Sequence, residues 1–469
     1  MKRLLIALVV LFLLAACLPA SSPVDPRQLT FAPMTFTVPV VDRITLPNGM
    51  RLYLREDHEL PMVRISGMVD GGALGEPDDK VGLTDLFGST LRTGGAGERG
   101  PEEFDRALED LAINLSASVD SYATNFSLSA RSADLEPALE LLADMVRRPQ
   151  FAPQRIDITR QQMLEGIRRR NDQPGAVASR LFRETLYAGH PFGRTPSVAS
   201  VTAIERADLL AFQQRFFYPD NLWLAISGDF ERADLLRKLT AVFGDWATGA
   251  PKKQVVPAVT TQAQGRVLVT NKDLPQTTVM IGELGIRKDN PDVYAVQVMN
   301  FILGGGGFNS RLMREIRSNR GLAYSVYSGF RPGRRLPGVF YAGCETKSAS
   351  TLEAIDLLRA ELRLMRDQPV GREELVLAQE SLINSFVFSF DDSHAVVSQS
   401  MQLDFYDYPP DYLSRYRERI AAVSIADVQR VAQTYLHPDQ QLLVLVGKVD
   451  SFDRAPESLN LPVTNVSLD

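Results

Sequence analysis

Residues that bind metals are scarce in this sequence. Its 469 residues include only four histidines and two cysteines. No two histidines stand four residues apart, the spacing that brings two imidazoles to one ion on a helix face. A catalytic zinc ion needs about three protein ligands, mostly histidines with a carboxylate. The sequence therefore offers no contiguous zinc site, and leaves open only a site assembled from distant residues. The histidines are His58, His190, His394 and His437, and the cysteines are Cys17 and Cys344.

Basic clusters and long apolar runs are also missing. The formal net charge is −6, and no run of Lys and Arg stands out. This charge pattern argues against nucleic acid as a partner. No apolar segment reaches the length of about 20 residues that a transmembrane helix needs.

The N-terminus has the pattern of an export signal. A basic start, Met1-Lys2-Arg3, precedes an apolar run over residues 4–16 that is too short to span a bilayer. The run ends in Leu14-Ala15-Ala16-Cys17, which resembles the lipobox of bacterial lipoproteins. We therefore expect residues 1–17 to be a lipoprotein signal peptide and Cys17 to carry the lipid. The alternative is an ordinary secretory signal with a chance cysteine.

The residues after Cys17 favour the lipoprotein. Residues 18–40 begin with a Pro- and Ser-rich stretch, which is typical of a tether. Leu18 is not the aspartate associated with retention in the inner membrane. We expect a bacterial cell-envelope protein, anchored to the outer membrane through its lipid and facing the periplasm. With Cys17 lipidated, Cys344 has no cysteine to pair with in the same chain.

The sequence repeats itself at an offset of 216 to 219 residues. Three matches share this offset: Ala138–Leu142 with Ala354–Leu358, Tyr218-Pro219-Asp220 with Tyr435 and Pro438-Asp439, and Gly228 with Gly447. Matches at a constant offset indicate a duplicated unit. We expect an N-terminal domain over residues 41–247, a linker over 248–264, a C-terminal domain over 265–450 and a tail over 451–469.

Strand-like and helical patterns alternate within each half. Residues 51–55, 63–69 and 125–131 have period-two character, and residues 135–148 have apolar side chains at helical spacing. The continuous apolar runs Leu222–Ile226 and Leu442–Val446 predict a strand that closes each half. The sequence predicts an α+β fold of two homologous domains, each a mainly antiparallel sheet with helices packed on it.

Short motifs follow one another in a specific order over about residues 43–448. They are Leu46-Pro47-Asn48-Gly49, Gly71-Gly72, Pro191-Phe192-Gly193, Tyr218-Pro219-Asp220-Asn221, Gly304–Gly307, Ser310-Arg311-Leu312 and Arg320–Ser325. Each motif is modest alone. The ordered set resembles the M16 family of zinc peptidases, the pitrilysin/insulinase family that includes the mitochondrial processing peptidase. The resemblance implies the same duplicated fold.

The zinc motif of that family is degenerate here. Family enzymes carry His-x-x-Glu-His, and the matching residues of this chain are Asp85, Gly88 and Ser89 within Gly82–Ser89. The family's third ligand is a glutamate roughly 76 residues further on, which matches Glu165. One carboxylate does not hold zinc usefully. We expect no metal in this chain, and we interpret Glu165 as a surface residue beside Arg168.

A second block of the family is intact. An Arg and a Tyr seven residues apart bind the substrate and stabilise its oxyanion in family enzymes, and they match Arg317 and Tyr324. Arg presents a planar fork of donors to a peptide carbonyl, and a Tyr hydroxyl can stabilise a tetrahedral oxyanion. The glycine run Gly304–Gly307 lacks the Lys-Ser/Thr of a phosphate loop, so we interpret it as a turn.

Two functions remain open on these residues. The first is a zinc-free subunit of a heterodimeric peptidase that supplies Arg317 and Tyr324 in trans to a zinc-bearing M16 paralogue, with peptides or small unfolded polypeptides as substrates. The second is a non-proteolytic binding or scaffold protein, as the core subunits of the respiratory bc1 complex are. A self-sufficient zinc peptidase with an unrecognised site is the lesser alternative. The sequence does not distinguish a homodimer from a heterodimer.

Overall fold

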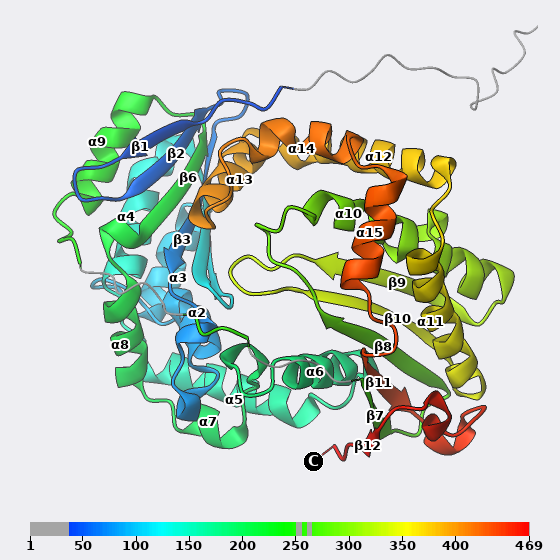
Figure 1. The fold of residues 1–469 in the computed structure, drawn as a ribbon. Coiled ribbons are helices and arrows are strands. Elements are labelled where there is room, and N and C mark those ends of the chain that lie inside the picture. The colour runs from blue at the N-terminus through cyan, green and yellow to red at the C-terminus, as the bar shows by residue number, and fades with distance from the viewer. Residues whose placement is uncertain (1–36, 250–255, 260–264, 469) are drawn as a thin grey trace, which may run out of the picture. The chain divides into compact units, whose positions relative to one another are not determined.

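The computed structural model describes residues 37–249, 256–259 and 265–468 (Figure 1). The predicted signal peptide and Cys17 lie outside the described residues, as do most of the predicted tether and part of the predicted linker. Within the described ranges, every helix is too short or too polar to cross a membrane.

The first half of the chain forms a six-stranded sheet in the order β1-β2-β6-β3-β5-β4. Only β2 and β6 run parallel, and the other neighbours are antiparallel. The strands are β1 (Asp42–Thr45), β2 (Arg51–Glu56), β3 (Met62–Asp70), β4 (Asn114–Val119), β5 (Ala123–Arg131) and β6 (Leu222–Gly228).

The second half forms a sheet in the order β12-β7-β11-β8-β10-β9. Its strands are β7 (Arg266–Asn271), β8 (Gln276–Leu284), β9 (Ala323–Arg331), β10 (Val339–Lys347), β11 (Leu442–Gly447) and β12 (Val463–Asn465). Five strands of each sheet correspond to one another. The order β2-β6-β3-β5-β4 of the first sheet matches the order β7-β11-β8-β10-β9 of the second, with the same parallel and antiparallel pairings. The predicted α+β fold of two homologous, mainly antiparallel sheet domains is therefore confirmed.

Helices pack on both sheets. Those of the first half are α2 (Leu83–Thr93), α3 (Pro101–Asp110), α4 (Leu135–Arg147), α5 (Pro153–Arg169), α6 (Pro174–Leu186), α7 (Val198–Thr202), α8 (Arg206–Phe216) and α9 (Arg232–Phe243). Those of the second half are α10 (Val293–Asn300), α11 (Thr351–Asp367), α12 (Arg372–Val387), α13 (Ser393–Phe405), α14 (Tyr412–Ala421) and α15 (Ile425–Tyr435). The repeated segments Ala138–Leu142 and Ala354–Leu358 lie in α4 and α11, which follow the equivalent strands β5 and β10.

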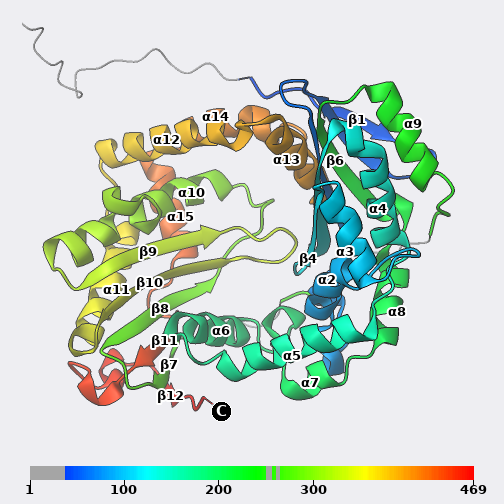
Figure 2. The ribbon, with the colours of Figure 1, turned by 180° about the vertical axis from the view of Figure 1, so that it is seen from behind.

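One helix from each half of the chain packs on the sheet of the other half (Figures 1 and 2). Helix α6 packs on β11 and β8, and helix α13 packs on β6 and β2. In β11, Leu443 and Leu445 face the helices of the second half, whereas Leu442, Val444 and Val446 pack with residues of α6. A strand covered on both faces reads as a continuous apolar run, which explains the pattern of Leu442–Val446.

A polar contact anchors α13 on the first sheet. The His394 ring lies between two serine hydroxyls, with Nε2 2.8 Å from Ser66 Oγ and Nδ1 3.0 Å from Ser227 Oγ. Burial, with a smaller contribution from Arg64, lowers the pKa of His394 to about 4. A neutral ring can donate to one serine and accept from the other. The contact therefore joins the two halves without burying a charge.

Candidate functional site

Helix α2, which carries the degenerate zinc motif, has a well-formed start. The Glu76 carboxylate accepts hydrogen bonds from the backbone N–H groups of Gly82 at 3.2 Å and Thr84 at 2.6 Å, and from the Thr84 hydroxyl at 2.6 Å. These bonds satisfy donors that the first turn of a helix leaves unpaired. Burial raises the pKa of Glu76, and the hydrogen bonds oppose that rise. The first turn of α2 is therefore stabilised by hydrogen bonds, although the metal-binding histidines of the family motif are absent from this helix.

The three motif positions do not form a metal site. Asp85 and Ser89 lie exposed one turn apart on α2, whereas Gly88 is buried against β4. A Cβ at Gly88 would stand 3.1 Å from Val119 Cγ2 and 3.2 Å from Val119 N. The close approach of β4 leaves little room for a glutamate at position 88. Asp85 has its pKa raised by partial desolvation, which Arg183 opposes.

Glu165 and the histidines are engaged elsewhere. Glu165 is exposed on α5, where Arg168 donates to its carboxylate at 3.4 Å. Each histidine has a separate partner: His58 with Asp229, His190 with Phe192 and Pro257, His394 with Ser66 and Ser227, and His437 with Glu283. Among the described residues, no three His, Cys, Asp or Glu side chains gather closely enough to hold a metal ion. These residues do not fit the catalytic zinc of the M16 family.

The structure brings Arg317 and Tyr324 together. The Arg317 guanidinium lies 4.4 Å from the centroid of the Tyr324 ring and 4.7 Å from that of Phe308. Contact with an aromatic face stabilises a cation and holds its planar fork in one orientation. Tyr324 and Phe308 remain 80% and 67% exposed, so the cluster can contact another molecule. Phe308, Arg317 and Tyr324 are called the Arg/Tyr cluster below.

Both members of the predicted pair lie at backbone irregularities. Arg317 belongs to a π-helix, Met313–Asn319, a conformation that occurs frequently at functional sites. On β9, Val326 pairs with Cys344 but Ala323 pairs with Thr346, so two residues of β9 stand opposite one of β10. This bulge breaks the alternation and leaves Tyr324 exposed while Ala323 and Val326 stay buried. Bulges of this kind re-aim side chains beside active sites.

Sequence reasoning missed Phe308, which lies in the turn after the glycine run. That run permits close packing: a Cβ at Gly304 would stand 2.5 Å from Ser328 N on β9, and Gly307 has a φ of +59°. The predicted turn over Gly304–Gly307 is confirmed only in part, because Gly304 and Gly305 end a π-helix, Phe301–Gly305, and the chain turns at Gly306 and Gly307. Phe308 follows directly, in a short 3₁₀ turn, Gly307–Asn309. The signal available in the sequence was an aromatic residue directly after the glycine run, which did not by itself place Phe308 beside Arg317.

An ion pair fixes the segment that carries Arg317. Arg311 Nε and Nη2 donate to the two oxygens of Glu374 on α12 at 2.8 and 2.7 Å. The hydrogen bonds from Arg311 lower the pKa of Glu374 to about 2. Both side chains are largely buried, so the pair is better protected from solvent than a surface pair.

We expect Glu374→Gln to lower the free energy of unfolding by roughly 2 kcal/mol at pH 7. A carboxylate with a lowered folded-state pKa stabilises above its unfolded pKa of about 4.3, and this contribution fades as pH falls toward the folded value. The difference between variant and wild type should therefore shrink by about half at pH 3. Urea unfolding at both pH values measures it, with Glu380→Gln on the exposed face of α12 as control. An equal difference at both pH values would contradict this.

Comparisons with known proteins agree with the fold. The family model described as insulinase (peptidase family M16) matches residues 51–197, and the one described as peptidase M16 inactive domain matches residues 203–382. A solved structure from Pseudomonas fluorescens, described as a peptidase M16 inactive domain, is 27% identical with a TM-score of 0.78. The match covers 87% of this chain and 98% of that one.

Curated relatives carry two kinds of description. An uncharacterized zinc protease of Streptomyces coelicolor is 26% identical over 86% of this chain and 89% of its own length. The non-peptidase homolog YmxG of Helicobacter pylori is also 26% identical, over 70% of this chain and 76% of its own. Because the chain is equally identical to a protein described as a zinc protease and to one described as a non-peptidase homolog, overall identity does not decide whether it takes part in peptide cleavage. The residues at the positions of the zinc motif and of the Arg/Tyr cluster decide it.

Proposed function

Because this chain belongs to the insulinase family of peptidases, M16, we propose that it is the zinc-free subunit of a two-chain peptidase. It supplies Arg317 and Tyr324 to substrate held at the zinc site of a paralogous subunit. One contrast supports this function above all others. Helix α2 has Asp85 and Ser89 where family enzymes have their two zinc-binding histidines and Gly88 where they have the general base, whereas the Arg/Tyr cluster is assembled and exposed.

The division of labour follows from the side chains. The partner supplies the metal, the general base and the attacking water, because Asp85, Gly88 and Ser89 do not provide them at the matching positions of this chain. The Arg317 fork binds a carbonyl of the peptide, and the Tyr324 hydroxyl donates to the oxygen on which negative charge develops. An exposed cation in contact with two aromatic rings favours this role over that of a pure scaffold, which needs neither Arg317 nor Tyr324.

The lone chain should neither hold zinc nor cleave peptides. Asp85 and Ser89 provide one carboxylate and one hydroxyl where zinc requires imidazoles, and Gly88 stands where family enzymes have the general base. We expect less than about one zinc per ten chains by metal analysis after dialysis, and no peptidase activity that a chelator abolishes. One tightly bound zinc per chain together with chelator-sensitive cleavage would overturn the proposal and favour the self-sufficient peptidase.

For localisation, we propose a lipid anchor at Cys17 that holds the protein in the outer membrane, facing the periplasm. Cys17→Ser removes the thiol that would carry the lipid, so the variant should appear in the soluble fraction or as an unprocessed precursor. Membrane fractionation and N-terminal mass analysis check this. A wild-type protein that is freely soluble, with its mature N-terminus elsewhere, would refute the anchor.

A non-proteolytic scaffold is the second candidate. The observation that favours it is the similarity to the Helicobacter pylori protein described as a non-peptidase homolog. The scaffold predicts that substitutions at Arg317 and Tyr324 leave the activity of any partner unchanged. The zinc-free subunit of a two-chain peptidase, called the half-site subunit below, predicts large losses.

A further inference from the structure

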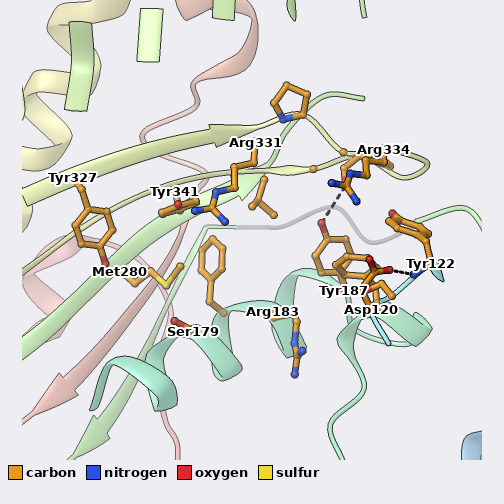
Figure 3. A pocket seen from close by; sticks show the side chains of 18 residues that line it. Asp120, Tyr122, Ser179, Arg183, Tyr187, Met280, Tyr327, Arg331, Arg334 and Tyr341 are labelled. Atoms are coloured by element: carbon orange, nitrogen blue, oxygen red, sulfur yellow. Dashed lines mark hydrogen bonds between the residues drawn. The ribbon is translucent and has the colours of Figure 1, made fainter. Parts of the chain in front are cut away.

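A second feature is a cavity of about 640 Å³, which no member of the Arg/Tyr cluster lines. One wall is helix α6 of the first half, and the opposite wall is the face of β8, β9 and β10 with the loop between β9 and β10 (Figure 3). The volume is within the range of about 300–1,000 Å³ that small ligands occupy. Its apolar lining includes Phe182, Phe192 and Met280.

Strand register places three polar side chains in a row on the sheet wall. Tyr341 of β10 is paired with Gly329 of β9, so Tyr327 and Arg331 are its diagonal neighbours on the same face. A Cβ at Gly329 would stand 2.4 Å from Tyr341 Cζ, so the absence of a side chain at Gly329 lets the Tyr341 ring lie against the strand. Figure 3 shows Tyr327, Tyr341 and Arg331 following one another along this wall.

The donors on this wall are not used by the protein. In the described part of the chain, the hydroxyls of Tyr327 and Tyr341 have no hydrogen-bond partner, and Arg331 has no ion pair. The Arg331 guanidinium lies over the Tyr341 ring, 5.4 Å from its centroid. Burial raises the pKa of Tyr327, so its hydroxyl stays protonated and able to donate at neutral pH.

The charge at the cavity is positive. Besides Arg331, the lining includes Arg334, stacked 4.4 Å from the Tyr406 centroid, and Arg183, which donates to the Thr195 hydroxyl at 3.1 Å. Neither forms an ion pair within the described ranges. Among the described residues that line the cavity, the one carboxylate is that of Asp120, which already accepts from the backbone N–H groups of Tyr122 and Ala123. Positively charged hydrogen-bond donors beside apolar side chains suit a ligand that carries an anionic group on an apolar body.

We propose that this cavity binds a carboxylate attached to an apolar or aromatic body, and that its source is the free C-terminus of a short peptide. The Arg331 fork binds the carboxylate, together with the phenol hydroxyl of the neighbouring Tyr341, and the side chain of the terminal residue packs against Phe182 and Met280. The peptide as source rests on the proposed function. Binding to the cavity itself does not, because all the residues that the proposal uses belong to this one chain.

Calorimetric titration of the lone chain tests the inference with three probes. N-acetyl-Leu-Phe should bind, its C-terminal amide should bind at least about tenfold more weakly, and 3-phenylpropionate should bind more weakly than the peptide acid. Equal binding of acid and amide, or no binding of either, would overturn the carboxylate site. Binding of 3-phenylpropionate as tight as that of the peptide acid would overturn the peptide as source.

Variants locate the binding in the cavity. Arg331→Gln combined with Arg334→Gln should weaken binding of the peptide acid at least about tenfold while leaving the amide unchanged. Tyr341→Phe should weaken it less, and Arg237→Gln on exposed α9 is the matched control that should bind like wild type. Unchanged binding by the double variant would contradict the site. These titrations need no partner and no cleavage, so they can succeed even where the two-chain peptidase fails its own test.

Discussion

Tyr324→Phe is expected to lower the turnover number of the reconstituted two-chain peptidase by about 10²–10³. The phenol hydroxyl bonds more strongly to the developing oxyanion than to the ground-state carbonyl, so its removal raises the barrier rather than weakening substrate binding. KM should therefore change little, while kcat falls. The ring itself stays, so the contact with Arg317 at 4.4 Å and the packing of the cluster are kept.

The measurement is cleavage of a quenched fluorescent peptide by this chain mixed with its zinc-bearing paralogue. Tyr218→Phe is the matched control, because it removes a hydroxyl that donates to the Gln214 carbonyl in the first half of the chain. Size-exclusion chromatography of each mixture shows whether assembly is intact. A Tyr324→Phe complex that assembles and turns over like wild type would remove the catalytic role from Tyr324.

Arg317→Ala is expected to affect substrate binding as well as turnover. Arg317 contacts the peptide in the ground state, so KM should rise and kcat should fall, with kcat/KM reduced by about 10²–10³. Arg317→Lys keeps the charge but loses the planar fork, and it should recover only a small part of the activity. Steady-state kinetics of both variants in the mixed complex measure this split.

Phe308→Ala separates orientation from chemistry. It removes one of the two rings in contact with the Arg317 guanidinium while leaving the guanidinium and the Tyr324 hydroxyl in place. A partial loss of peptide cleavage by the mixed complex, smaller than that of Arg317→Ala, fits a residue that positions Arg317.

If complexes with Arg317→Ala and with Tyr324→Phe both cleave peptide like wild type, the half-site subunit fails and the scaffold replaces it.

The duplicated fold was predictable because its signals are local. Repeats at an offset of 216 to 219 residues fall on equivalent elements, α4 with α11 and β6 with β11. The exchange of α6 and α13 between the halves was not predictable. The continuous apolar run Leu442–Val446 implied cover on both faces, but nothing in it specifies which helix provides the second cover.

The candidate site was predictable only where a resemblance supplied the residues. Asp85, Gly88 and Ser89 could be aligned with a motif, as could Arg317 and Tyr324. The bulge at Tyr324 depends on register between β9 and β10, and a single sequence does not fix it. The row of Tyr327, Tyr341 and Arg331 depends on the same register. Phe308 belongs to no periodic pattern, so only the folded turn places it beside Arg317.

The most direct test of the half-site subunit compares peptide cleavage by three samples at equal concentration: this chain alone, the zinc-bearing paralogue alone, and the two mixed. The account predicts no cleavage by either chain alone, chelator-sensitive cleavage by the mixture, and its loss when the mixture contains Arg317→Ala. A mixture that cleaves no faster than the paralogue alone would contradict the account, because Arg317 and Tyr324 would then contribute nothing in trans.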